Sequence, residues 1–371
     1  MAPPTNGNEY KSFTDLIALE RLNANSYRSI ALAFGPAEGT RTYDILISSM
    51  ARTTSDHITS TATAAMSTCK HAMQPARRYP KDSLCMQNVT GWFLLPGKAN
   101  ERFIYNVRVI RNGGYSTRGV DVVQESDPGV CFTCICSFKK PEKTSTPSID
   151  VRPHLDLQHE FDAVLNDKQP HEHQEMPGVD APWYWEFSKR NGGYTDPFPG
   201  LHLQKVDMDA HNTSKPPHGL DHRNLKYYST RGDMPSVEED PNMHLCAHLY
   251  ASDRNSLFVI SNHIGIGNDY SQMGSLSHTV ILHGTAEELD MTDRATGKAR
   301  WFCQEAWTGG SRQGRGTHQS RMWADDGLHI ATTLQDGMVR LAMEGQEGKP
   351  GFSPEAMIRQ LESRMGGKGK L

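Results

Sequence analysis

Three groups of residues in this sequence have types and spacing that could support chemistry. Cys131 and Cys134 have the separation of a zinc-binding pair, and His171-Glu172-His173 places three possible metal ligands side by side. Asp253 stands in a mostly apolar stretch, where its carboxylate could act as a base or could simply mark an exposed helix end. Each group also has a purely structural interpretation.

For the first two groups the structural interpretation is favoured. A zinc site needs about four ligands, yet the cysteine pair has no second pair of the same spacing and shares an expected strand with Cys136. The histidine cluster lies in a connector rich in Pro, His and acidic residues, which is typical of a solvated loop. We therefore expect no metal and no cofactor.

Several classes of protein are disfavoured by what the sequence lacks. There is no Gly-x-Ser-x-Gly elbow, which argues against a serine-type α/β-hydrolase. Gly265-Ile266-Gly267 lacks the strand–helix context of a nucleotide-binding loop. The 371 residues carry a net charge of −4, whereas nucleic-acid binders are normally basic, so no nucleic-acid partner is expected.

The sequence also predicts a compartment. No run approaches 18 apolar residues, so we expect no membrane span, and the polar first ten residues predict no secretory signal. The seven cysteines show no disulfide framework, which suits a reducing compartment. Gly369-Lys370-Leu371 loosely resembles a peroxisomal tail. We expect a peroxisomal or cytoplasmic protein.

The elements that would position a site occur twice along the chain. Both halves contain, in the same order, a Gly-Gly pair, an Arg-Gly pair, an alternating run, an Asp/Gly turn and a second run. These signals are Gly113-Gly114, Arg118-Gly119 and Asp127-Pro128-Gly129 in the first half, and Gly309-Gly310, Arg315-Gly316 and Asp325-Asp326-Gly327 in the second. Such a repeated order indicates a tandem duplication.

Strand-like runs precede each of these hairpins, so each half offers four consecutive antiparallel strands. The expected strands lie at 89–95, 103–110, 120–124 and 130–138 in the first half, and at 276–282, 299–307, 318–322 and 328–338 in the second. A helix expected from Asn242 to about Phe258 is apolar on most sides and therefore buried. A sheet wrapped around a central helix is the hot-dog architecture, so we predict an α+β double hot dog.

The predicted domains follow from this duplication. An N-terminal hot dog covers residues 8–141, a linker 142–199, a C-terminal hot dog with the candidate site 200–343, and a tail 344–371. Residues 44–87 are atypical, because 48–68 are rich in Ser, Thr and Ala without a helical period and 71–80 are basic and interrupted by prolines. The first hot dog could therefore lack a well-formed core helix.

Five sequence strings resemble the acyl-CoA thioesterase II family, which includes bacterial thioesterase II and the peroxisomal acyl-CoA thioesterases. They are Leu249-Tyr250-Ala251-Ser252-Asp253-Arg254-Asn255, Gly274-Ser275-Leu276-Ser277-His278-Thr279, Thr333-Leu334-Gln335-Asp336-Gly337-Met338-Val339-Arg340, Phe93-Leu94-Leu95-Pro96-Gly97 and Ser137-Phe138-Lys139-Lys140-Pro141-Glu142. The resemblance covers most of residues 88–342. This chain departs from the family pattern at Ser277, where the family has Asp.

The resemblance implies a site and a reaction. In the family an Asp, a Thr or Ser, and a Gln hold the water that attacks a thioester, and these correspond here to Asp253, Ser275 and Gln335. We expect hydrolysis of fatty acyl-CoA to a fatty acid and CoA, with Asp253 taking the proton of the water. Self-association into a homo-oligomer is expected by analogy only.

Two other functions remain open at this point. A double hot dog with a compromised first half could bind acyl-CoA, or serve as a scaffold, without turnover. A hot-dog enoyl-CoA hydratase is disfavoured, because Phe258 stands where those enzymes place their catalytic His. Basic residues for the CoA phosphates are available at Arg312, Arg315 and Arg321, although an ordinary charged hairpin explains them equally well.

Overall fold

The fold is taken from a computed structural model, which describes residues 11–31, 84–95, 97, 101–140, 149–193, 199–341 and 354–367. Its strands are β1 Leu19–Arg21, β2 Ser26–Ser29, β3 Cys85–Phe93, β4 Phe103–Arg111, β5 Tyr115–Gln124, β6 Asp127–Lys139, β7 Gln174–Glu175, β8 Leu201–Lys205, β9 Asn224–Thr230, β10 Tyr270–Leu282, β11 Phe302–Arg312, β12 Arg315–Trp323 and β13 His329–Leu341. Its helices are α1 Phe13–Leu16, α4 Leu157–Glu160, α5 Asp162–Leu165, the 3-10 turn η1 Pro170–Glu172, α6 Pro182–Arg190, α7 Asp209–Thr213, α8 Pro241–Asp253, α9 Ser256–His263 and α10 Pro354–Gly367.

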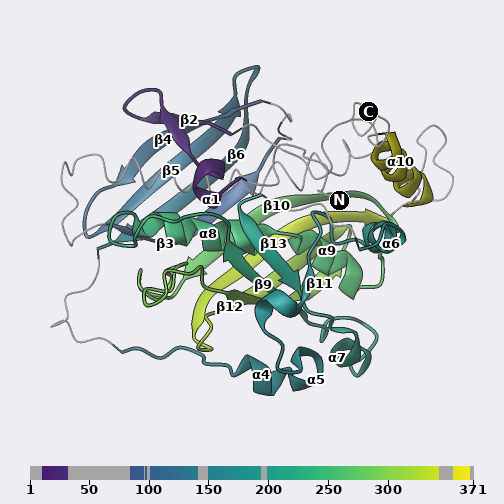
Figure 1. Cartoon of the computed structure of the whole chain (residues 1–371). Helices are drawn as coiled ribbons and strands as arrows, with labels where there is room; N and C mark the ends of the chain where they lie inside the picture. Colours follow the sequence, from purple (N-terminus) through teal and green to yellow (C-terminus); the bar gives the residue numbers. More distant parts are fainter. Residues whose placement is uncertain are drawn as a thin grey trace.

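All described strands belong to one antiparallel sheet in the order β1-β2-β4-β5-β6-β3-β10-β13-β12-β11-β9-β8-β7. The two halves meet where β3 pairs with β10, for example Val89 with Val280. These two strands hold equivalent places in the two repeats, and an antiparallel pair of equivalent strands is what a two-fold relation between repeats produces. Figure 1 shows both halves as parts of one curved sheet. The double hot dog expected from the sequence is thus the observed fold.

The centre of the fold is α8, whose residues are almost all buried. Its apolar positions surround the helix, so it packs against both repeats, and Met86 N of β3 donates to Asn242 Oδ1 at 3.0 Å. Asp240 caps the start of the helix by accepting from Met243 N, with Pro241 in the first turn. One core cluster therefore includes residues of both halves, such as Tyr105 and Tyr250.

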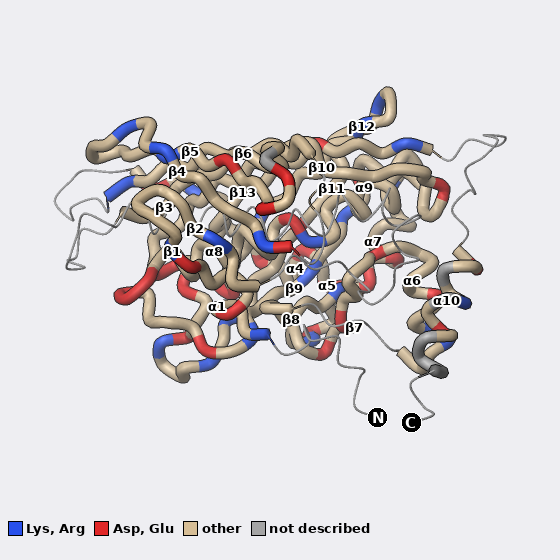
Figure 2. The backbone as a smooth tube through the Cα atoms, turned by 90° about the horizontal axis from the view of Figure 1, so that it is seen from above, with Lys and Arg blue, Asp and Glu red and all other residues tan. Residues whose placement is uncertain are grey.

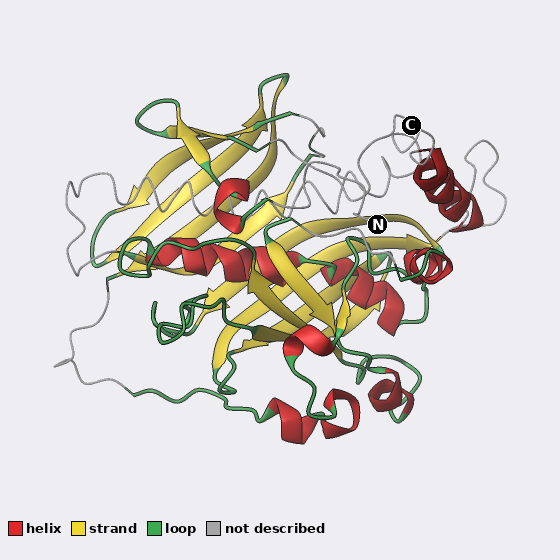
Figure 3. Cartoon of the chain, viewed as in Figure 1, coloured by secondary structure: helices red, strands yellow, loops and turns green. Residues whose placement is uncertain are grey.

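The single helix expected over 242–258 is wrong in one respect, because the structure divides it. Helix α8 ends at Asp253, Asn255 adopts a left-handed conformation with φ 57°, and α9 begins at Ser256. The Asn255 side chain accepts from Asp180 N at 3.3 Å and donates to Pro177 O at 3.1 Å. Asparagine tolerates this conformation better than most residues, and these contacts hold it there. Figure 3 shows α8 and α9 as separate red segments.

The connector between the repeats is more ordered than the solvated loop expected for it. Its described part contains α4, α5, η1, β7 and α6, and α6 buries Trp183, Tyr184 and Phe187 against α9 and β10 residues. The domain boundaries themselves stay predictions. Residues 44–83 and the last three residues of the chain, which the sequence singled out, lie outside the described residues, whereas 85–87 belong to β3.

Positions of both charge signs occur in both halves of the chain. Figure 2 shows Lys and Arg positions and Asp and Glu positions along the backbone of both. Among the described residues, no helix has both the length and the apolar character that crossing a bilayer requires.

Helix α9 approaches the sheet closely over Gly316 of β12 and Gly337 of β13, which face each other. A Cβ added to Gly316 would lie 2.6 Å from Ile260 Cγ2, and one added to Gly337 would lie 2.3 Å from Leu257 Cδ2. The two glycines therefore fix how near α9, and the break before it, can come to the strands.

We predict that Gly316→Ala lowers the free energy of unfolding by about 1–3 kcal/mol, because Ile260 is β-branched and cannot yield without moving α9. Gly114→Ala is the matched control, since an added Cβ there meets nothing within 4 Å. Urea unfolding of both variants provides the measurement. Equal stability of the two would mean that α9 does not depend on this contact.

Candidate functional site

The structure brings together the three residues that the sequence resemblance selected. The Gln335 amide nitrogen lies 2.7 Å from Asp253 Oδ1 and 2.7 Å from Ser275 Oγ, and donates to both. The side chains are buried, with exposed fractions of 0% for Gln335, 3% for Asp253 and 7% for Ser275. A carboxylate, a hydroxyl and an amide thus form one hydrogen-bonded group that is nearly closed to solvent.

Each of the three comes from a different element. Asp253 is the last residue of α8, Ser275 lies on β10 and Gln335 lies on β13. Strands β10 and β13 are neighbours, and a register shift on β10 lies between Ser275 and Ser277. Because of this bulge both Ser275 and His278 face the helices, although they are three residues apart.

The same bulge explains why the Ser277 departure leaves the group intact. Ser277 pairs with Asp336 on one side and with Trp92 on the other, and Trp92 is 44% exposed. Successive residues of a strand point to opposite faces. Ser277 therefore lies on the outer face, away from Gln335.

A row of buried polar residues crosses the sheet beneath the end of α8. His278, Gln335, His318 and Thr308 stand at facing positions of β10, β13, β12 and β11. Burial lowers the pKa of His278, an effect that the nearby Asp253 carboxylate opposes. The sequence resemblance did not point to His318. Its alternation within the β12 run was the available signal, because it predicts an inward-facing side chain.

The hydrogen bonds of His278 fix its tautomer. Ser252 Oγ donates to Leu249 O at 2.8 Å and lies 3.0 Å from His278 Nε2. Because a hydroxyl has one hydrogen, Ser252 accepts from His278, and Nε2 carries the proton. His278 Nδ1 is then an acceptor, and it has no partner among the described residues.

A buried lysine holds the end of α8. Lys226 Nζ donates to Ala251 O at 3.0 Å and to Arg254 O at 2.5 Å, so it binds one carbonyl in the last turn of α8 and one just after it, where intrahelical hydrogen bonds run out. Burial lowers the pKa of Lys226 to about 7, with Arg254 acting in the same direction and Asp253 and Asp180 opposing. The position of Asp253 depends on this support.

The candidate metal ligands and the position of the hydratase histidine have structural roles in the fold. Cys131, Cys134 and Cys136 are buried in β6. His173 stacks on Tyr227 with ring centroids 5.5 Å apart, and within the described part of the chain no three His, Cys, Asp or Glu residues group as metal ligands. Phe258, where a hydratase would have His, belongs to a core cluster.

The remaining candidates lie apart from the three site residues. Arg315 pairs with Asp336, and Arg321 lies over the Trp307 ring. None of these contacts involves Asp253, Ser275 or Gln335.

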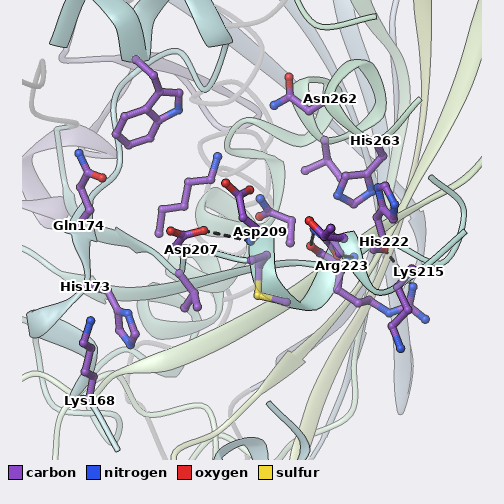
Figure 4. A pocket seen from close by; sticks show the side chains of 18 of the residues that line it. Lys168, His173, Gln174, Asp207, Asp209, Lys215, His222, Arg223, Asn262 and His263 are labelled. Carbon is purple, nitrogen blue, oxygen red and sulfur yellow. Dashed lines mark hydrogen bonds between the residues drawn. The ribbon is translucent and has the colours of Figure 1, made fainter. Parts of the chain in front are cut away.

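A cavity of about 970 Å³ lies beside the end of α9, lined by Val259, Asn262 and His263 of that helix. Figure 4 shows His263 beside His222, and their rings are 5.7 Å apart. Cations and acids both line the cavity: Lys168, Lys205, Lys215 and Arg223, and Glu172, Asp207 and Asp209. Charge alone therefore selects no ligand for it, and the three site residues do not line it.

Comparison with known proteins shows which proteins this chain is similar to. Residues 170–339 match the family model described as the acyl-CoA thioesterase C-terminal domain. Acyl-coenzyme A thioesterase 8 of Mus musculus is 24% identical over 291 residues, which is 75% of this chain and 80% of the relative. The Homo sapiens protein of the same name is 23% identical over 294 residues, with the same two shares.

Residues 170–339 thus match this thioesterase domain, and the whole chain resembles the acyl-CoA thioesterase II family.

The solved acyl-CoA thioesterase II TesB2 of Mycobacterium marinum shares this fold, with a TM-score of 0.56 and 19% identity over 89% of this chain and 98% of that one. A hot-dog protein from Alicyclobacillus acidocaldarius gives a TM-score of 0.55 at 15% identity, over 89% and 98% of the two chains. The domain match and the names of the relatives support a thioester hydrolase.

The contacts that Lys226 makes at the end of α8 predict a pH effect on stability. A lysine with a pKa of about 7 in the fold and about 10.4 when unfolded binds more protons in the unfolded state between those values. Its contribution to stability therefore increases as pH rises above 7. We expect the stability of wild type relative to Lys226→Met to grow between pH 7 and about 9, as measured by urea unfolding.

Lys298→Met, at an exposed lysine, is the control and should keep a constant difference from wild type over this range. A constant difference for Lys226→Met as well would show that Lys226 keeps an ordinary pKa in the fold.

Proposed function

We propose that this thioesterase hydrolyses fatty acyl-CoA with a water that Asp253 activates and that Ser275 and Gln335 hold. One observation carries the proposal: a single amide nitrogen joins the Asp253 carboxylate to the Ser275 hydroxyl in a buried place. The orientation of this amide follows from charge, because its oxygen would repel the carboxylate while its nitrogen donates to it.

Buried acceptors around this group suit the two hydrogens of one water. Asp253 Oδ2, Gln335 Oε1 and His278 Nδ1 have no hydrogen-bond partner in the described part of the chain. Unpaired buried polar atoms are costly, and a bound water is a common way to satisfy them. A water that donates to Asp253 Oδ2 and to one of the other two acceptors, and that accepts from the Ser275 hydroxyl, would keep one oxygen lone pair free for attack.

The proposed reaction balances without a covalent intermediate. The water oxygen forms a bond to the thioester carbonyl carbon while its proton passes to Asp253. The tetrahedral intermediate then expels the CoA sulfur, which takes that proton as the C–S bond breaks. The products are a carboxylic acid and the free thiol, and Asp253 returns to its carboxylate form.

A serine nucleophile finds less support in the geometry. A nucleophilic serine needs a base within hydrogen-bond reach, but Ser275 Oγ accepts from Gln335, and the nearby His278 uses Nε2 for Ser252. We therefore assign Ser275 to holding the water rather than to attack on the substrate.

Substrate class and cellular setting remain part of the proposal. The names of the mammalian relatives support an acyl-CoA substrate. A fatty acyl chain, a peroxisomal or cytoplasmic location and self-association stay predictions. The alternative is a double hot dog that binds acyl-CoA without turnover, and the following experiment decides between the two.

We predict that wild type releases CoA thiol from at least one member of a series of fatty acyl-CoAs. Asp253→Asn should lower kcat at least about 100-fold, since it removes the base while keeping the shape of the side chain. Thiol release is followed spectroscopically. Asp233→Asn, at an exposed aspartate, is the control and should keep full activity. A folded wild type that releases no thiol from any chain length would favour the binding-only alternative.

Ser275 gives a second test of the same arrangement. Ser275→Thr keeps the hydroxyl and should retain activity, whereas Ser275→Ala loses one hydrogen bond. At about 0.5–1.5 kcal/mol for such a bond, kcat should fall roughly threefold to tenfold. Loss of activity in the Thr variant with a normal Ala variant would contradict the proposed role. The measurement is kcat for the acyl-CoA that wild type hydrolyses best.

A further inference from the structure

Hydrolysis of a thioester needs a donor for the negative charge that develops on the carbonyl oxygen. Asp253, Ser275 and Gln335 together offer few hydrogen-bond donors for this oxygen. Both hydrogens of the Gln335 amide nitrogen are directed to Asp253 and Ser275. The one hydrogen of Ser275 remains for holding the water. Another donor is required close to Gln335.

His318 lies next to Gln335 on the neighbouring strand. The two residues face each other across β12 and β13, where facing side chains lie about 4.5–5.5 Å apart at Cβ. Thr308 faces His318 from the other side. His318 is 1% exposed, and its Nδ1 is buried without a hydrogen-bond partner among the described residues. A buried imidazole nitrogen of this kind needs a partner that the fold itself does not provide.

The two histidines that flank Gln335 differ in what they can donate. His278 commits its one N–H to Ser252, so it offers only an acceptor. No hydrogen bond fixes the tautomer of His318 in the described structure. Its N–H can therefore be placed on the nitrogen that faces a substrate.

We propose that His318 is a further catalytic residue, whose neutral imidazole donates an N–H to the carbonyl oxygen of the thioester as its negative charge develops. The proposal rests on the function proposed above. No proton is transferred: the hydrogen bond strengthens in the tetrahedral intermediate and weakens when the C–S bond breaks and the carbonyl re-forms.

The surroundings of His318 keep the ring neutral. Burial holds its pKa well below the usual range, and Lys226, His278 and His263 act in the same direction. A charged imidazolium beside Gln335 would attract the Asp253 carboxylate and weaken it as a base. A neutral donor stabilises the oxyanion without this competition, and it does so across the neutral pH range.

The test compares donor-free and donor-bearing replacements. His318→Leu and His318→Phe remove the donor, while His318→Gln keeps an N–H on a neutral side chain. We expect the donor-free variants to lose about 100-fold to 1,000-fold in kcat, as for removal of an oxyanion donor elsewhere. KM should stay within roughly threefold, and His318→Gln should stay within roughly tenfold of wild-type kcat. His171→Leu, at an exposed histidine, is the control and should behave as wild type.

Binding of a thioether analogue, in which a methylene replaces the carbonyl, separates catalysis from structure. Its affinity should be the same for wild type and for whichever donor-free variant has the melting temperature of wild type. Equal losses of kcat in the Gln and donor-free variants, together with weaker analogue binding, would mean a structural role and overturn the proposal.

Two further outcomes distinguish this proposal from the proposed function. Wild-type kcat in the donor-free variants, with Asp253→Asn inactive, would overturn the role of His318 and leave the water mechanism standing. A folded wild type without thioesterase activity on any acyl-CoA would overturn both.

Discussion

The buried carboxylate of Asp253 is the group on which the arrangement of the site depends. A carboxylate removed from water costs several kcal/mol unless polar groups compensate it. Here a neutral amide, Gln335, supplies the closest hydrogen bond, and Lys226, whose pKa burial lowers to about 7, interacts electrostatically from further away. Neither neutralises the carboxylate by direct pairing. One of its oxygens is thereby left available for a proton from another molecule.

This carboxylate also stands at the end of a helix where a negative charge is least favoured. The C-terminus of a helix carries a partial negative charge from its unpaired carbonyls. Lys226 donates to Ala251 O in the last turn of α8 and to Arg254 O just after it, and Asn255 turns the chain so that α9 begins at Ser256 rather than continuing α8. The helix break at Asn255, the buried Lys226 and the Gln335 amide therefore all help to stabilise the negative charge of Asp253 at the C-terminus of α8.

Sequence patterns predicted the strands and the central helix because these depend on local alternation and on apolar character along each segment. The break at Asn255 could not be predicted in this way, because it depends on Pro177 and Asp180, which are far away in sequence. The resemblance selected Asp253, Ser275 and Gln335, but only the β10 bulge shows why Ser277 is irrelevant to them. His318 was missed because facing positions on β12 and β13 follow from register, which no local pattern fixes.

The row of facing residues that contains Gln335 changes from polar to apolar where β10 of the second repeat pairs with β3 of the first. On the strands of the second repeat, β10, β13 and β12, the row holds His278, Gln335 and His318. On the adjacent strands of the first repeat, β3 and β6, the residues in line with them are Gly91 and Cys134. An added Cβ on Gly91 would lie 2.4 Å from the Phe132 ring, so that side is packed with apolar groups. The hydrogen bond with Cys136, together with burial, raises the pKa of the Cys134 thiol, which keeps it protonated and unreactive. Within the described residues, the two repeats therefore contribute similar sets of strands to one sheet, but the row of polar residues at the site lies on the strands of the second repeat.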